Sequence, residues 1–139
     1  MLKEEAYVTD YEMCVNLSKL GYCEGSEYGI TQYTEDYVYG EDPNHSESHK
    51  KGDIEIIRLY TKNKEDRWLY EVPLIYEVGK WLREKRDINI IVTYDIEDCE
   101  YICMFQDMVN GSISYIDGKY ISYEDAYKNC IKFCINEKL

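Results

Sequence analysis

The stretch SYEDAYKNCIKFCI, residues 122–135, decides the fold class of this chain. Its apolar residues recur at intervals of three and four positions, which is typical of one face of an α-helix. Ser122 with Asp125 resembles an N-terminal capping box, although Asp replaces the usual Glu. The pattern predicts a helix over about 122–136, whose apolar side must be covered by a sheet or by another helix. That side consists of Tyr123, Ala126, Tyr127, Cys130, Ile131, Cys134 and Ile135.

A second helix is predicted upstream, over about 73–85. Pro73 suits its first position, because the N–H that proline lacks would have no partner there. Gly79 lowers helix propensity but permits a neighbouring element to pack closely. The apolar positions at helical spacing are Leu74, Val78, Trp81 and Leu82.

A third, shorter helix is predicted near the start of the chain, over about 9–20. Thr9 with Glu12 forms a capping box, and Gly21 stands where a helix commonly ends. Its apolar stripe is narrow, so we expect it to pack against another element rather than to be stable alone.

Runs of β-branched and aromatic residues between these helices predict strands. The dipeptide Asp117-Gly118 is a signal for a two-residue hairpin turn. The predicted strands cover residues 54–61, 88–94, 99–105 and 113–116, with short Tyr-rich candidates at 28–33 and 36–39.

This order of elements predicts an α+β fold. We expect a two-layer sandwich in which a mostly antiparallel sheet of about four or five strands carries helices mainly on one face. Residues 1–139 form one domain on this reading, since the length suits a single core. Residues 40–53 combine Pro43 with two His, two Ser and several acids, and are predicted to be a flexible acidic loop.

Acidic residues and tyrosine dominate the composition. The chain has 28 Asp and Glu against 16 Lys and Arg, a formal charge of −12, and 16 Tyr. The electrostatic field of such a negative chain disfavours direct nucleic-acid binding and favours partners with a basic surface. Tyrosine is enriched at protein interfaces, so the acidic, Tyr-rich residues 22–53 are the predicted contact surface. The candidate partner-binding residues are Tyr28, Tyr33, Glu35, Asp36, Tyr37, Tyr39, Glu41 and Asp42.

The cysteines form two C-x3-C pairs, Cys99/Cys103 and Cys130/Cys134. Four thiolates could hold zinc if the two pairs faced each other. Both pairs stand in apolar periodic runs, however, and a free Cys packs as a small hydrophobic residue. We therefore expect reduced, buried thiols and no bound metal or other cofactor.

Two polar groupings contain residue types that can bind metal ions. His45 and His49 are spaced as helical ligands, but their segment is rich in turn-forming residues, so a solvated loop is expected. A second group of acids bunches at a predicted turn and could hold a hard cation, but it lacks the spacing of a calcium loop. It consists of Asp95, Glu97, Asp98 and Glu100.

Common catalytic signatures are absent from the sequence. It contains no Walker loop, G-x-G-x-x-G, G-x-S-x-G or H-E-x-x-H motif, which makes an enzyme the least expected class. No secretory leader follows Met1, and no apolar run is long enough to span a membrane. We therefore expect a cytoplasmic location.

The segment VPLIYEVGKWLREKRDINIIV, residues 72–92, and the closing helix at 122–135 together resemble small uncharacterised proteins of gut Bacteroidales and of their phages and prophages. The resemblance implies a phage-type accessory protein in the cytoplasm of a bacterial host cell. It carries over no site residue, because neither stretch is a catalytic motif.

The leading hypothesis is a non-enzymatic acidic protein-interaction domain, a phage-type accessory or inhibitor protein that binds a host or phage protein. One version has the acidic surface imitating nucleic acid and blocking a basic site. The alternative is a small-molecule or nucleotide-binding domain, in which Trp68 and tyrosines line a pocket.

Overall fold

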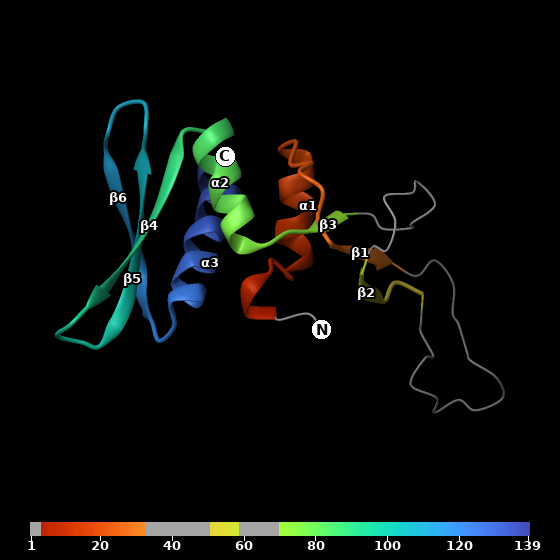
Figure 1. Ribbon diagram of the computed structural model, residues 1–139, viewed down its shortest axis with the longest axis horizontal. Helices are drawn as coiled ribbons and strands as arrows, with labels where there is room; N and C mark the ends of the chain where they lie inside the picture. The colour runs from red at the N-terminus through yellow and green to blue at the C-terminus, as the bar shows by residue number, and fades with distance from the viewer. Residues whose placement is uncertain (1–3, 33–50, 59–69) are drawn as a thin grey trace.

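The computed structural model describes residues 4–32, 51–58 and 70–139 and confirms an α+β fold (Figure 1). The elements in chain order are η1 (Glu4–Ala6), α1 (Tyr11–Lys19), β1 (Tyr28–Gln32), β2 (Ile54–Arg58), β3 (Tyr70–Val72), α2 (Ile75–Lys85), β4 (Ile88–Asp95), β5 (Glu100–Asp107), β6 (Ile113–Tyr120), α3 (Tyr123–Phe133) and the π-helical turn η2 (Cys134–Lys138).

The strands are divided between two antiparallel sheets instead of forming the single sheet that was expected. One sheet has the order β2-β1-β3 and the other the order β4-β5-β6. β1 is the central strand of the first sheet and β5 is the central strand of the second. The helix α2 directly follows β3 and separates the last strand of the first sheet from the first strand of the second.

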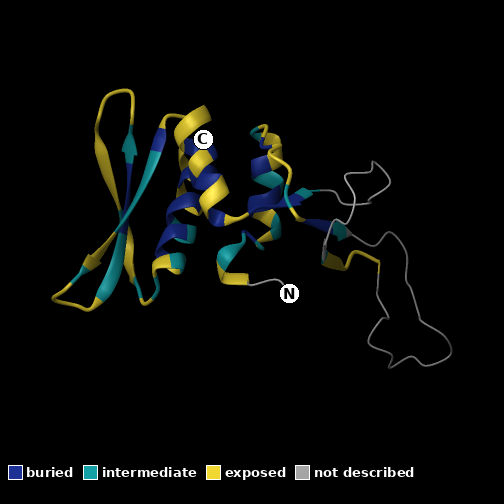
Figure 2. Ribbon diagram, in the orientation of Figure 1, coloured by how far each residue is buried: buried dark blue, intermediate teal, exposed yellow. Residues whose placement is uncertain are grey.

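The helices α2 and α3 cover one side of the β4-β5-β6 sheet, and α1 lies beyond them next to β3 (Figure 1). Figure 2 shows the buried residues where these helices meet one another and the sheet. The core includes Leu17, Ile75, Leu82, Phe105 and Ile131, all 4% exposed or less. Burying each such side chain stabilises the fold by about 1.5–3 kcal/mol relative to leaving it in water.

The closing helix α3 follows the sequence prediction closely. The Ser122 hydroxyl accepts a hydrogen bond from the Asp125 backbone N–H at 3.1 Å, which confirms the N-cap. Ala126, Tyr127, Cys130, Ile131, Cys134 and Ile135 are buried. Tyr123, at the start of the predicted apolar side, is 37% exposed.

The first helix begins one residue later than the predicted capping box requires. Asp10 is the N-cap, and its carboxylate accepts from the Met13 N–H at 3.2 Å. The reason is a long-range contact: the Val8 N–H donates to the Pro73 carbonyl at 2.8 Å, which holds residues 7–8 extended. Gly21, with a φ of +93°, follows the helix end as predicted.

The same contact explains the start of α2. Pro73 lies before the helix and Leu74 is its N-cap, because Tyr7 and Leu74 form an antiparallel bridge. Leu74 is consequently 37% exposed, and Ile75 takes its expected place in the core. The close packing predicted at Gly79 is confirmed, since a Cβ there would collide with the Tyr127 phenol ring of α3.

The predicted hairpin turn at Asp117-Gly118 is wrong, because both residues lie within β6. Tyr101 pairs with Tyr120 and Cys103 with Ile116, so β6 carries extra residues opposite β5 in a bulge. Gly118 has a φ of +123°, which a bulge accommodates and glycine tolerates. The chain turns earlier, where Asp107 accepts hydrogen bonds from the two N–H groups of residues 109 and 110.

Candidate functional site

The side of the β4-β5-β6 sheet that points away from the helices is the first candidate surface. Side chains alternate along a strand, and Tyr101 and Phe105 of β5 contact Tyr123 and Phe133 of α3. The alternate residues of β5, Ile102, Met104 and Gln106, together with their cross-strand partners, therefore point the other way. We call this set the outer face: Asn89, Ile91, Thr93, Ile102, Met104, Gln106, Ile113 and Tyr115.

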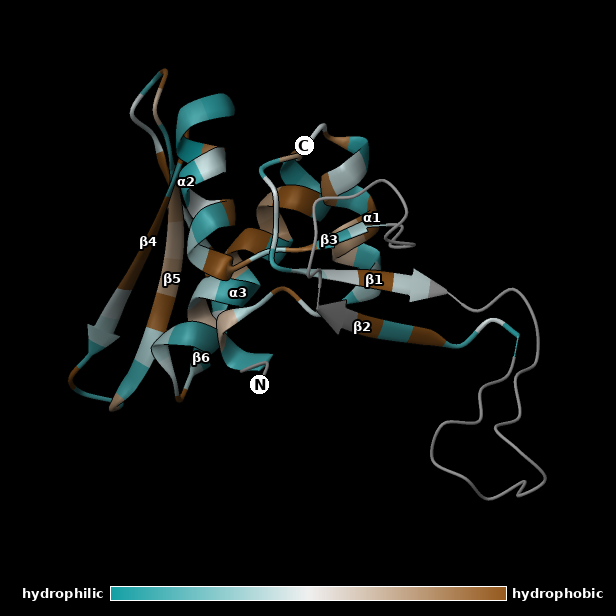
Figure 3. Ribbon diagram, turned by 45° about the vertical axis from the view of Figure 1, so that its right-hand side comes forward, coloured by the Kyte–Doolittle hydropathy of each residue, from teal (hydrophilic) through white to brown (hydrophobic). Residues whose placement is uncertain are grey.

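The outer face is apolar at its centre and carries no charge. Tyr115 is 73% exposed and Ile113 is 47% exposed. Met104, opposite Tyr115, is only 9% exposed, and Ile91 of β4 lies opposite Met104. Apolar stretches of β4 and β5 are brown in Figure 3. An antiparallel sheet with one wet face usually alternates apolar and polar residues. Here both faces are apolar at their centres, which is typical of a sheet that is covered on both sides.

Acidic residues border the outer face at the β4–β5 turn. Asp95 and Glu100 are paired at the strand ends, and the Asp95 carboxylate accepts from the Glu97 N–H at 3.0 Å. Lys119 forms ion pairs with Asp98 and, at 3.8 Å, with Asp95, so part of this charge is neutralised. Within the described ranges, no three His, Cys, Asp or Glu side chains are placed to hold a metal ion.

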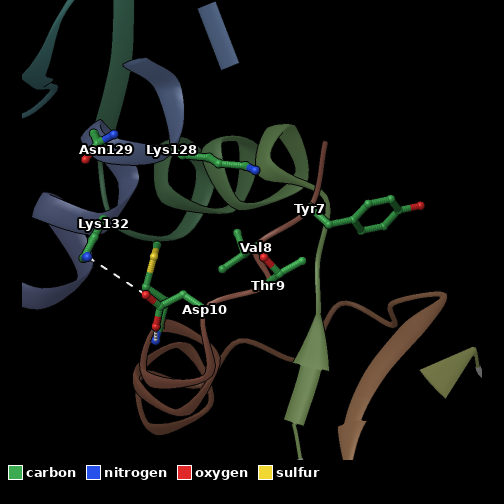
Figure 4. A pocket seen from close by; sticks show the side chains of 8 residues that line it. Tyr7, Val8, Thr9, Asp10, Lys128, Asn129 and Lys132 are labelled. Atoms are coloured by element: carbon green, nitrogen blue, oxygen red, sulfur yellow. Dashed lines mark hydrogen bonds and ion pairs between the residues drawn. The ribbon is translucent and has the colours of Figure 1, made fainter. Parts of the chain in front are cut away.

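A cavity of about 190 Å³ lies between residues 7–10 and α3 (Figure 4). Its two lysines are both engaged within the protein. The Lys128 ammonium donates to the Glu4 carbonyl at 2.6 Å, and Lys132 lies 3.9 Å from Asp10, toward which Figure 4 shows it directed. Pockets for drug-sized ligands usually measure roughly 300–1,000 Å³, so this cavity is too small for a nucleotide.

A second cavity, of about 220 Å³, collects acidic and aromatic side chains near the start of α2. We call it the carboxylate pocket. The lining loop at Gly25 and Ser26 is held by the buried Glu71, whose carboxylate accepts from the N–H groups of these two residues at 2.6 and 2.7 Å. The lining side chains are Tyr7, Tyr22, Glu24, Ser26, Glu27, Val72, Leu74 and Glu77.

The electrostatic environment of this pocket is negative. Burial raises the pKa of the Tyr22 hydroxyl, and the nearby carboxylates of Glu71, Glu77 and Glu24 raise it further. Sequence reasoning placed Tyr22 and Glu24 in the acidic segment 22–53 but did not connect them with Glu77. No local pattern links residues so far apart in the chain.

The structure corrects one of the predicted partner-binding residues. Tyr28 is 8% exposed and packs edge-on against Tyr7, with ring centroids 5.1 Å apart. It belongs to the core and is not an exposed contact. The other seven candidates, Tyr33, Glu35, Asp36, Tyr37, Tyr39, Glu41 and Asp42, lie outside the described residues, as do His45, His49, Trp68 and most of the predicted loop 40–53.

The cysteines are all free thiols, and the prediction that they are buried holds for four of the six. Cys23 and Cys99 are exposed, the latter in a turn with a φ of +54°. The Cys130 thiol donates to the Met104 carbonyl at 3.3 Å, and hydrogen bonds with Cys103 and Cys134 raise its pKa. The buried Cys130 thiol therefore stays protonated and serves in packing.

Among the residues the structure describes, no helix is both long and apolar enough to cross a membrane. Comparison of the chain with protein-family models, with curated proteins and with solved structures found no match.

Proposed function

We propose that this chain is a protein-interaction domain that binds its partner through the outer face of the β4-β5-β6 sheet. The observation that carries the proposal is an apolar centre in which Ile113 and Tyr115 are exposed. They lie beside the half-buried Ile91 and Ile102 and the buried Met104. Interfaces have such a centre, depleted in charge and enriched in Tyr and Met, surrounded by a polar rim. A sheet face of this kind is stabilised when a second apolar surface removes it from water.

The partner that fits is a protein with an apolar contact surface bordered by basic side chains. Asp95, Glu97 and Glu100 supply an acidic border at the β4–β5 turn, and the whole chain carries a formal charge of −12. Charge complementarity at a rim speeds association and selects among partners, whereas the apolar centre supplies most of the affinity. Binding should therefore be faster at low salt.

The proposed setting of this interaction is the cytoplasm of a bacterial host cell. A phage-type accessory or inhibitor protein in the cytoplasm of a bacterial host would use its negative field to approach a basic host or phage protein. The acidic segment 22–53 adds to the negative charge. Its candidate residues would contribute to electrostatic steering; they are Glu35, Asp36, Glu41 and Asp42. If the partner normally binds nucleic acid, the acidic surface of this chain would imitate that nucleic acid and block the partner's basic site.

The outer face is tested by affinity capture with a matched pair of variants. The double variant Ile113→Ser/Tyr115→Ser should lose a captured bacterial protein that the wild type retains. Ile54→Ser is the control, because Ile54 is 48% exposed against 47% for Ile113 but lies in the other sheet. Retention of the same protein by the double variant would contradict the proposal.

Light scattering on the purified chain completes the test. A dimer that dissociates in the Ile113→Ser/Tyr115→Ser variant, but persists in Ile54→Ser, would show that a second copy covers the outer face. The proposed foreign partner would then be wrong. A monomer in all three forms, with specific capture by two of them, is the expected outcome.

A further inference from the structure

The carboxylate pocket combines features that the outer face does not have. None of its lining residues comes from β4, β5 or β6, so it is a separate site. Glu24 enters from the loop after α1 and Glu77 from the first turn of α2. In the described part of the chain, neither carboxylate has an ion pair, and no Lys, Arg or His lines the cavity. The negative charge of Glu77 also offsets the partial positive charge at the start of α2.

A buried hydroxyl supplies the second, independent observation. Tyr22 is only 6% exposed, lines the pocket, and packs edge-on against Trp81 with ring centroids 5.5 Å apart. Its hydroxyl has no hydrogen-bond partner among the described residues. Most buried polar groups in proteins are hydrogen-bonded, so an unpaired hydroxyl in a cavity indicates a place where a polar ligand binds.

We propose that the carboxylate pocket binds a guanidinium group, the side chain of an arginine on a peptide or protein. Glu24 and Glu77 accept hydrogen bonds from its N–H groups, and the Tyr22 hydroxyl oxygen accepts another. The tyrosine rings of the lining provide faces on which the planar cation stacks. A cavity of about 220 Å³ suits one side chain rather than a whole metabolite.

Arginine fits better than lysine for geometric reasons. Guanidinium presents five donors in a planar fork, which matches two carboxylates and a hydroxyl around one cavity. A lysine ammonium is a more strongly hydrated point charge and stacks less well on rings. That the arginine belongs to the partner protein rests on the proposed function, whereas the pocket's preference for guanidinium does not.

The probe is N-acetyl-L-arginine amide, titrated at constant ionic strength and compared with N-acetyl-L-citrulline amide, which has the same shape but no charge. Trp81 fluorescence reports occupancy because Trp81 contacts Tyr22, and a Trp68→Phe background leaves Trp81 as the only tryptophan. Calorimetry on the wild type gives the same affinity independently. We expect saturable binding of the arginine probe, with the citrulline probe weaker by about tenfold or more. A lysine probe should fall between the two.

Variants separate the pocket from the overall charge. Glu24→Gln/Glu77→Gln should weaken arginine binding by roughly tenfold, since each exposed carboxylate contributes up to about fivefold. Glu84→Gln/Glu137→Gln removes the same charge elsewhere, with Glu84 two turns further along α2, and should change the affinity less than about twofold. Tyr22→Phe should weaken binding while preserving the ring contact with Trp81.

Three results would overturn the inference: no saturable response to the arginine probe, equal binding of citrulline, or equal losses in the two double variants. The outer-face variant Ile113→Ser/Tyr115→Ser should bind the arginine probe like the wild type. Failure of this inference is therefore distinguishable from failure of the proposed function.

Discussion

Gly79 is the point at which a single residue controls the distance between two helices. A Cβ built on Gly79 would lie 2.8 Å from the Cζ atom of Tyr127 and would overlap its hydroxyl. Alanine normally stabilises a helix interior relative to glycine by about 1 kcal/mol. At this position we expect the opposite sign: Gly79→Ala should lower the free energy of unfolding by about 1–3 kcal/mol, because the added carbon overpacks the α2–α3 contact. Urea denaturation measures the change.

A double-mutant cycle identifies the cause. Removing the hydroxyl with Tyr127→Phe takes away the nearest colliding atom, so Gly79→Ala should cost less in that background than in the wild type. An equal cost in both backgrounds would show that the Tyr127 hydroxyl is not what opposes a side chain at residue 79.

The element on which the fold depends most is α3. It contacts α2, β4, β5 and β6, and Ile131 in its middle is completely buried. Ile131→Ala should therefore lower the free energy of unfolding by about 2–5 kcal/mol, through lost burial and the cavity left behind. Lys132→Ala is the neighbouring control. Its side chain is 52% exposed and its ion pair with Asp10 spans 3.9 Å, so a loss below about 1 kcal/mol is expected. Similar losses in both variants would refute the packing of α3 described above.

The stability of the whole molecule should fall in alkaline solution. Burial, reinforced by the charge of Asp10, raises the pKa of the Cys14 thiol from 9.0 to about 12. Burial likewise raises the pKa of Tyr127 from 10.0 to about 12. The folded state holds both protons more tightly than the unfolded chain does. Their contribution to stability is therefore complete below about pH 9 and is lost as the pH rises toward 12.

Denaturant unfolding at a series of pH values measures this slope. Cys14→Ser should reduce the slope from about pH 9 upward, and Tyr127→Phe from about pH 10 upward, because each variant removes one group whose pKa is raised on folding. Unchanged slopes in both variants would mean that other groups cause the alkaline loss.

The sequence by itself determined the elements whose residues interact locally. The three helices and the strands β4 and β5 were predicted within a few residues, because periodic burial and capping depend on neighbours three or four positions apart. The α+β class and the antiparallel pairing followed from their order. The Asp117-Gly118 error has the same origin: a local turn signal was outweighed by pairing with β5, which absorbed the glycine in a bulge.

Only the tertiary structure decided what depends on contacts between distant segments. The Val8–Pro73 hydrogen bond moved the starts of α1 and α2. The strands divided into two sheets because β1 pairs with β2 and β3, whereas β5 pairs with β4 and β6. Neither candidate site could be predicted as a unit. The outer face exists because the helices gather on the opposite side of the sheet, and the carboxylate pocket because Glu71 holds the loop at Gly25, 46 residues away in the chain. Such contacts form only when the whole core is buried, so no local sequence pattern encodes them.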